Sequence, residues 1–128
     1  MSDDSFSPVH KLLNDITCWS EALRARVDDS WNDEQRKLLD IIQTSTDNPA
    51  RFLTPLPPDP KDLLVWKHDT LSPIIAITGA AELLVEDFEL SPEFELKDYA
   101  QRIFDASIRA RELVIAIADA ALRKAPNG

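Results

Sequence analysis

The residues best suited to chemistry in this sequence are His68 and Asp69, which stand side by side shortly before Ser72 and Pro73. Imidazole is nucleophilic and largely uncharged near neutral pH, so it can accept a phosphoryl group and release it again. The adjacent carboxylate can hold the other ring nitrogen or accept a proton. Pro73 lacks the N–H that a helix uses at that position and predicts a bend just beyond the pair. The segment therefore predicts a nucleophilic or acid–base site.

Other chemistry is poorly represented in the chain. A histidine beside an apolar helix face can also be purely structural, and this is the interpretation we give His10, which has no acid beside it. No Cys, His and carboxylate cluster has the spacing of metal ligands. The single cysteine, Cys18, has no partner for an intramolecular disulfide. We therefore expect neither a metal nor a cofactor to be bound by this chain.

The composition limits the class of protein. The 128 residues carry a formal net charge of −9, which makes a polyanion such as nucleic acid an unexpected partner. No apolar run approaches the roughly 18 residues that a membrane span needs. The opening residues MSDDSFSPVH lack the basic start and apolar segment of a signal peptide. We therefore expect a cytoplasmic protein that is not bound to a membrane.

Nine prolines and only two glycines favour helix boundaries over sheet turns, so the predicted fold class is all-α. Apolar residues recur at alternating spacings of three and four, the period of an amphipathic helix. We expect four helices, at Pro8 to about Val27, about Glu34 to Phe52, about Asp62 to Phe88, and about Glu95 to Arg123. Pro49 should kink the second helix or end it early. The predicted buried seams are Val9, Leu13, Ile16, Ser20, Leu23 and Val27; Leu38, Ile41, Ser45, Asn48 and Phe52; Leu64, Leu71, Ile74, Thr78, Ala81, Val85 and Phe88; and Leu96, Ala100, Ile103, Ser107, Ala110, Val114, Ile117 and Ala121.

The two halves of the chain resemble each other. Ser7-Pro8 aligns with Ser72-Pro73, and along the second helices Ile41 aligns with Ile103 and Ser45 with Ser107. We interpret residues 6–53 and 62–124 as two copies of a helical hairpin, joined by a proline-rich linker at 54–61. In the first copy the position of His68 is held by Asp3, so that copy is degenerate. The prediction is one domain, 1–128, forming a pseudo-dimeric, antiparallel four-helix bundle.

The string HDTLSPIIAITGAAELL, beginning at His68, resembles the phospho-acceptor box of the dimerisation and histidine phosphotransfer (HisKA-type) domain of sensor histidine kinases. The stretch DEQRKLLDIIQTS, beginning at Asp33, is similar to the second helix of that domain. The resemblance implies an antiparallel four-helix bundle, with His68 as phospho-acceptor and Asp69 as the acid or base that orients it. Family kinases carry an ATP-binding domain after the hairpin, whereas this chain ends shortly after Lys124. We therefore expect no autonomous kinase activity.

By this resemblance the chain is expected to be a histidine-containing phosphotransfer protein of two-component signalling, and at most a histidine phosphotransferase. Its partners would be a response-regulator receiver domain, which brings its own magnesium, or a histidine kinase. Ser72 falls where the family's phosphatases carry Thr or Asn, so phosphatase activity is not implied. The alternative is an adaptor or inhibitor that binds a kinase or receiver through the bundle surface without accepting phosphate.

The resemblance also implies where a receiver would dock. The family positions below the histidine correspond to Ile75, Ala76, Gly79 and Ala80, which we expect to form a shallow exposed surface. Their counterparts in the first copy are polar: His10, Lys11, Asn14 and Asp15. Because the two hairpins can bury each other's seams, we expect a monomer, with the pairing of two chains as in the family as the alternative. Lys67 is expected to pair with Asp3 or Asp4.

Overall fold

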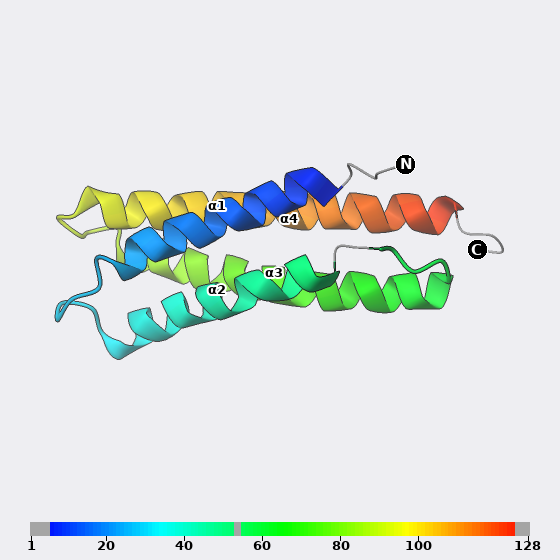
Figure 1. Cartoon of the computed structure of the whole chain (residues 1–128). Helices are drawn as coiled ribbons and strands as arrows, with labels where there is room; N and C mark the ends of the chain where they lie inside the picture. The colour runs from blue at the N-terminus through cyan, green and yellow to red at the C-terminus, as the bar shows by residue number, and fades with distance from the viewer. Residues whose placement is uncertain (1–5, 53–54, 125–128) are drawn as a thin grey trace.

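The computed structural model describes residues 6–52 and 55–124, and within them the chain forms four helices and no strands. The helices are α1 (Ser7–Arg24), α2 (Asp33–Phe52), α3 (Pro60–Asp87) and α4 (Phe94–Lys124). Consecutive helices run in opposite directions, and α1 and α3 begin at the same end of the molecule (Figure 1). The predicted all-α fold is confirmed.

The helices form a closed ring of contacts. α1 packs against α2 and α4, and α3 packs against the same two helices, so α1 and α3 occupy opposite corners. The contact between α1 and α2 is the least extensive of the four, whereas α3 and α4 pack together most extensively. This arrangement confirms the four-helix bundle.

Local sequence explains where the helices begin. Asn32 and Gln35 form a reciprocal capping box before α2, with N···O distances of 2.7 and 3.0 Å. Asp59 caps α3 by accepting a hydrogen bond from the Lys61 N–H at 2.8 Å, and Pro60 occupies the first turn, where its missing N–H costs nothing. The predicted linker is therefore too long at its C-terminal end, because Pro60 and Lys61 belong to α3. The predicted early end of α2 is also wrong, since α2 continues past Pro49 to Phe52.

In the predicted core of α1, Val9, Leu13, Ile16, Ser20 and Leu23 are all buried as expected, whereas Val27 lies beyond the end of the helix and is only partly buried. In α2 the predicted register holds at Leu38, which is buried, and is wrong from Ile41 onward. Ile41 is 42% exposed, whereas Ile42 and Thr46 are buried. Because Ile41 and Ile42 are both apolar, spacing alone does not distinguish them. The residues of α2 that correspond to Ile103 and Ser107 are thus one position further along than the sequence alignment predicts.

α3 differs from its predicted seam at its start. Leu64 is 55% exposed, and the buried positions are Leu63, Trp66 and Thr70. This part of α3 precedes Ser72, the counterpart of the first residue of α1, and it aligns with the part of the sequence before Ser7. The rings of Phe6 and Trp66 meet with centroids 6.4 Å apart and join the start of α1 to α3. Across the described helices, none is both long and apolar enough to cross a membrane.

Candidate functional site

His68 lies on the outer surface of α3, with its side chain 80% exposed. Its Nδ1 is 3.5 Å from an oxygen of Asp69, whose side chain is 48% exposed. Adjacent residues on a helix point about 100° apart, so a long contact is the expected geometry for such a pair. A distance of 3.5 Å is at the outer limit of a hydrogen bond. The arrangement leaves Nε2 of His68 open to solvent and places a carboxylate on the Nδ1 side.

Ser72 and Pro73, one helical turn after His68, affect the helix backbone at the site. The Ser72 hydroxyl donates a hydrogen bond to the His68 carbonyl at 3.0 Å. α3 continues through Pro73, which cannot donate to the carbonyl of Asp69 one turn earlier. A serine that bonds back to the preceding turn and a proline in the following position both perturb regular helix geometry. The hydroxyl of Ser72 is thus occupied by the backbone of α3.

Lys67 connects the site to α4. Its ammonium group lies 3.2 Å from a carboxylate oxygen of Asp119. The sequence predicts that Lys67 pairs with Asp3 or Asp4, which lie outside the described part of the chain. The ion-pair partner of Lys67 in the structure is Asp119. The ion pair is partly exposed, so its contribution to stability is small, on the order of 0–1 kcal/mol. It fixes Lys67 toward α4, away from the exposed face of α3.

Beneath the site the core is partly polar. Thr70 is fully buried, and its hydroxyl has no hydrogen-bond partner among residues 6–52 and 55–124. Two turns further on, the Thr78 hydroxyl lies 2.8 Å from the hydroxyl of Ser107 on α4 and also donates to the Ile74 carbonyl. The hydroxyls of Thr78 and Ser107 therefore both have hydrogen-bond partners, whereas the hydroxyl of Thr70 has none among the described residues. The sequence predicts Thr78 and Ser107 on buried seams, but it predicts neither the contact between their hydroxyls nor the burial of Thr70.

Several exposed residues of α3 on the side of His68 are apolar, although Ser72 and Glu82 are exposed on that side as well. Ile75 is 52% exposed, and Ala76 and Gly79 are exposed beside it. The expectation for Ala80 is wrong, because Ala80 is 4% exposed and belongs to the core. Three further exposed apolar residues extend the surface in both directions, namely Leu64, Val65 and Leu83. We call the exposed set Leu64, Val65, Ile75, Ala76, Gly79 and Leu83 the α3 apolar face.

Sequence reasoning missed Leu64, Val65 and Leu83 as surface residues. At about 100° per residue, all three fall within roughly 60° of His68 around the α3 axis. That angular position could have identified them, because it places them on the same side of α3 as His68. Leu64 had instead been assigned to the core because α3 is apolar on more than one side.

Comparison of the chain with models of known protein families, with curated proteins and with solved structures finds no match. Within the described residues, no group of three or more His, Cys, Asp and Glu side chains is placed to hold a metal ion.

Proposed function

We propose that this protein accepts a phosphoryl group on Nε2 of His68 and passes it to or from an aspartate of a partner receiver domain. The observation that carries the proposal is the position of His68: an exposed imidazole, with a carboxylate at its Nδ1, in the middle of the α3 apolar face. A structural histidine would be expected to be packed or satisfied within the protein. The resemblance of the surrounding segment to a phospho-acceptor box supports the same chemistry.

The transfer needs only groups that are present on α3 and on the donor. Asp69 accepts a hydrogen bond from Nδ1–H, so the lone pair of Nε2 faces outward as the nucleophile. Nε2 attacks the phosphorus of an aspartyl phosphate, the N–P bond forms, and the O–P bond breaks to release the donor carboxylate. The positive charge that develops on the imidazole is stabilised by Asp69. The same steps in reverse return the phosphoryl group.

The α3 apolar face supports docking of a protein. Exposed apolar side chains that gather on one face of a helix are typical of protein interaction surfaces. Ala76 and Gly79 are small, so a partner helix can approach the backbone of α3 closely beside Ile75. The metal for such a transfer would come with the receiver, since phosphoryl transfer from a receiver aspartate depends on groups of that domain.

The decisive experiment measures phosphorylation with and without a protein donor. The protein is incubated with phosphoramidate, a small donor that modifies histidine, and separately with a phosphorylated receiver domain. We expect a label on His68 that is acid-labile and base-stable, with release of ammonia in the first case. If phosphoramidate labels His68 but no receiver from a representative panel transfers phosphate, the adaptor alternative is favoured. If neither donor labels His68, the proposal is wrong.

A further inference from the structure

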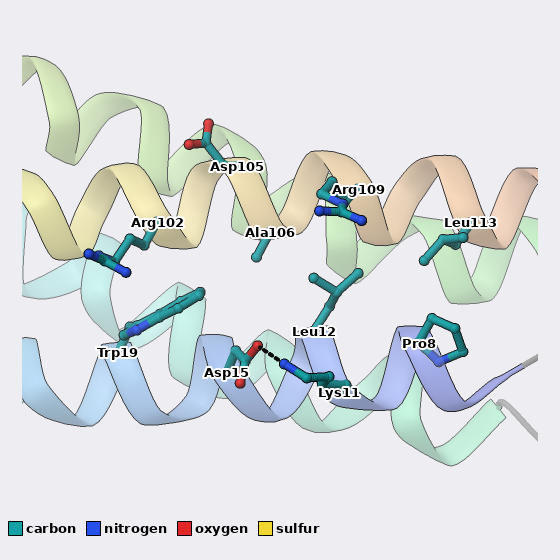
Figure 2. Close-up of a pocket in the computed structure, with 10 residues that line it drawn as sticks. All are labelled: Pro8, Lys11, Leu12, Asp15, Trp19, Arg102, Asp105, Ala106, Arg109 and Leu113. Atoms are coloured by element: carbon teal, nitrogen blue, oxygen red, sulfur yellow. Dashed lines mark hydrogen bonds and ion pairs between the residues drawn. The ribbon is translucent and has the colours of Figure 1, made fainter.

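A groove lies between α1 and α4 and contains no residue of α3 (Figure 2). Its volume is about 440 Å³, within the range of about 300–1,000 Å³ that is typical of binding sites. The residues that line it fall on successive turns of both helices, from Pro8 to Trp19 on α1 and from Arg102 to Leu113 on α4. The groove is therefore a trough about three helical turns long, or roughly 16 Å.

The pseudo-symmetry of the bundle explains why this groove is open. By the alignment of the two hairpins its counterpart lies between α2 and α3, and the α3 residues Ile77, Ala80 and Leu84 at the corresponding positions are buried. The aligned residues of α1 are only half-buried: Leu12, Asp15 and Trp19. Lys11 and Asp15 replace the small residues Ala76 and Ala80 of α3, and their charged groups cannot be buried against α4 without a large desolvation cost. The side chains of α1 therefore leave uncovered apolar surface between the two helices.

The groove combines an apolar floor with positive charge. Leu12, Ala106 and Leu113 lie along it, and the indole of Trp19 lies at one end, near Arg102 (Figure 2). Arg102 and Arg109 are seven positions apart on α4, so they lie on one face about 10 Å from each other.

The two arginines differ in their present partners. Arg102 contacts Asp98 at 2.9 Å, whereas Arg109 has no ion-pair partner within the described residues. Lys11 is engaged by Asp15 at 3.2 Å. The carboxylate of Asp105 points away from α1 in Figure 2. Arg109 therefore places an unpaired guanidinium beside an apolar floor, although the chain as a whole has a net charge of −9.

We propose that the α1–α4 groove binds an acidic amphipathic helix of a partner protein. Apolar side chains of that helix fill the floor at Leu12 and Leu113 and beside Trp19, and two acidic side chains seven positions apart meet Arg102 and Arg109. The helix-in-groove mode uses anchors at this spacing, and Trp and Arg are the residue types most often dominant in such interfaces. A small amphiphile with a single anionic head group meets only one of the two arginines, so charge complementarity along the groove favours a helix.

The test uses a panel of synthetic peptides of about 18 residues, long enough to cover the groove as a helix of roughly 27 Å. Each peptide has leucines on one face and two glutamates seven positions apart; a matched set replaces the glutamates by lysines. Binding is followed by the change in tryptophan fluorescence, which should come from Trp19 because Trp31 and Trp66 are buried elsewhere. The variant Trp19→Phe should therefore remove the fluorescence change. We expect micromolar affinity for acidic peptides and binding at least about tenfold weaker for the lysine set.

Variants locate the site. Arg109→Glu should weaken binding of the acidic peptides by at least about tenfold, whereas Arg123→Glu, which makes the same change of net charge near the exposed end of α4, should leave it unchanged. Equal losses in both variants, no loss in Arg109→Glu, or no binding by any acidic peptide would overturn the proposal. Tighter binding of dodecanoate than of any peptide would assign the groove to small amphiphiles instead. Sedimentation of the protein alone provides a further check, because a dimer disrupted by Arg109→Glu would show that a second copy covers the groove.

Discussion

The helices α1 and α3 occupy opposite corners of the bundle and share an inward face but not an outward one. Val9 and Leu13 of α1 are buried, as are the aligned Ile74 and Thr78 of α3. Outward, α3 presents Ile75, Ala76, Gly79 and Leu83, and the aligned residues of α1 are His10, Lys11, Asn14 and Cys18. The inward faces satisfy the same packing requirement. On the proposed function, the outward face of α3 differs because a partner covers it during phosphoryl transfer.

If the proposed function holds, the half of the molecule that meets a partner through its exposed helix surface is the one that contains α3. A polar outward face is the default for a bundle helix in water, and α1 has it. An apolar outward face weakens solubility and is retained where another molecule covers it. The α1 side carries its own open surface at a different place, in the groove with α4. The predictions that follow test these assignments, beginning with the largest expected effect.

Replacing the acceptor should have the largest effect. His68→Gln is expected to lower phosphorylation by phosphoramidate or by a receiver by at least about 100-fold, because it removes the only nucleophile proposed. The exposed position predicts little change in stability, within about 0.5 kcal/mol of wild type. Label is measured by ³¹P NMR and unfolding by urea titration. His10→Gln is the matched control on α1, and a label lost in that variant but kept in His68→Gln would reverse the assignment.

A charge on the α3 apolar face should weaken transfer from a receiver. Ile75→Glu or Leu83→Glu is expected to reduce the transfer rate at subsaturating receiver by at least about tenfold, equivalent to about 1.4 kcal/mol. Labelling by phosphoramidate, which needs no docking, should stay near the wild-type rate. Asn14→Glu makes the same charge change on the outward face of α1 and should leave both reactions unchanged. Equal effects of the α1 and α3 substitutions would contradict the distinction between the two faces.

Substitutions of two buried threonines of α3 should change the free energy of unfolding by small amounts and in opposite directions. Thr70→Val replaces an unpaired buried hydroxyl by a methyl group and should stabilise the protein by about 1 kcal/mol. Thr78→Val removes the hydrogen bond to Ser107 and should destabilise it by about 1 kcal/mol. Free energies of unfolding from urea titration distinguish the two. A loss of stability in both variants would show that the hydroxyl of Thr70 has a partner in solution.

The sequence was sufficient for much of the fold. Prolines and apolar spacing predicted four helices, and the seam of α1 was correct because its polar face is unambiguous. The register of α2 was predicted wrongly, because Ile41 and Ile42 adjoin and their spacing alone does not show which of the two is buried. The start of α3 was also misread, because its apolar residues surround the helix and periodicity carries little information there.

The site was predicted less completely than the fold. Residue types and the resemblance to a phospho-acceptor box single out His68 and Asp69, but their exposure depends on where the neighbouring helices lie. Ala80 was misassigned to the exposed surface, although it falls about 120° from His68 around the α3 axis and is buried. The groove between α1 and α4 was not foreseen, since it arises from side chains of two helices that are far apart in the sequence.

The turn between α1 and α2 should respond to acid, and this is the smallest effect that we predict. In the first turn Asp28 accepts hydrogen bonds from the Ser30 hydroxyl and N–H, and these, with a lesser effect of nearby Arg36, lower the pKa of Asp28 below its ordinary value. A lowered pKa means that the folded state favours the carboxylate. The resulting stabilisation is complete above the ordinary pKa and is lost as pH falls through the folded-state pKa. Asp28→Asn should therefore unfold at a slightly lower temperature than wild type at about pH 6, and the difference should shrink toward about pH 3. Asp29→Asn, the same change one residue away at a carboxylate without a hydrogen bond among the described residues, should show a smaller dependence; equal behaviour of the two variants would mean that the contact with Ser30 contributes nothing to the first turn.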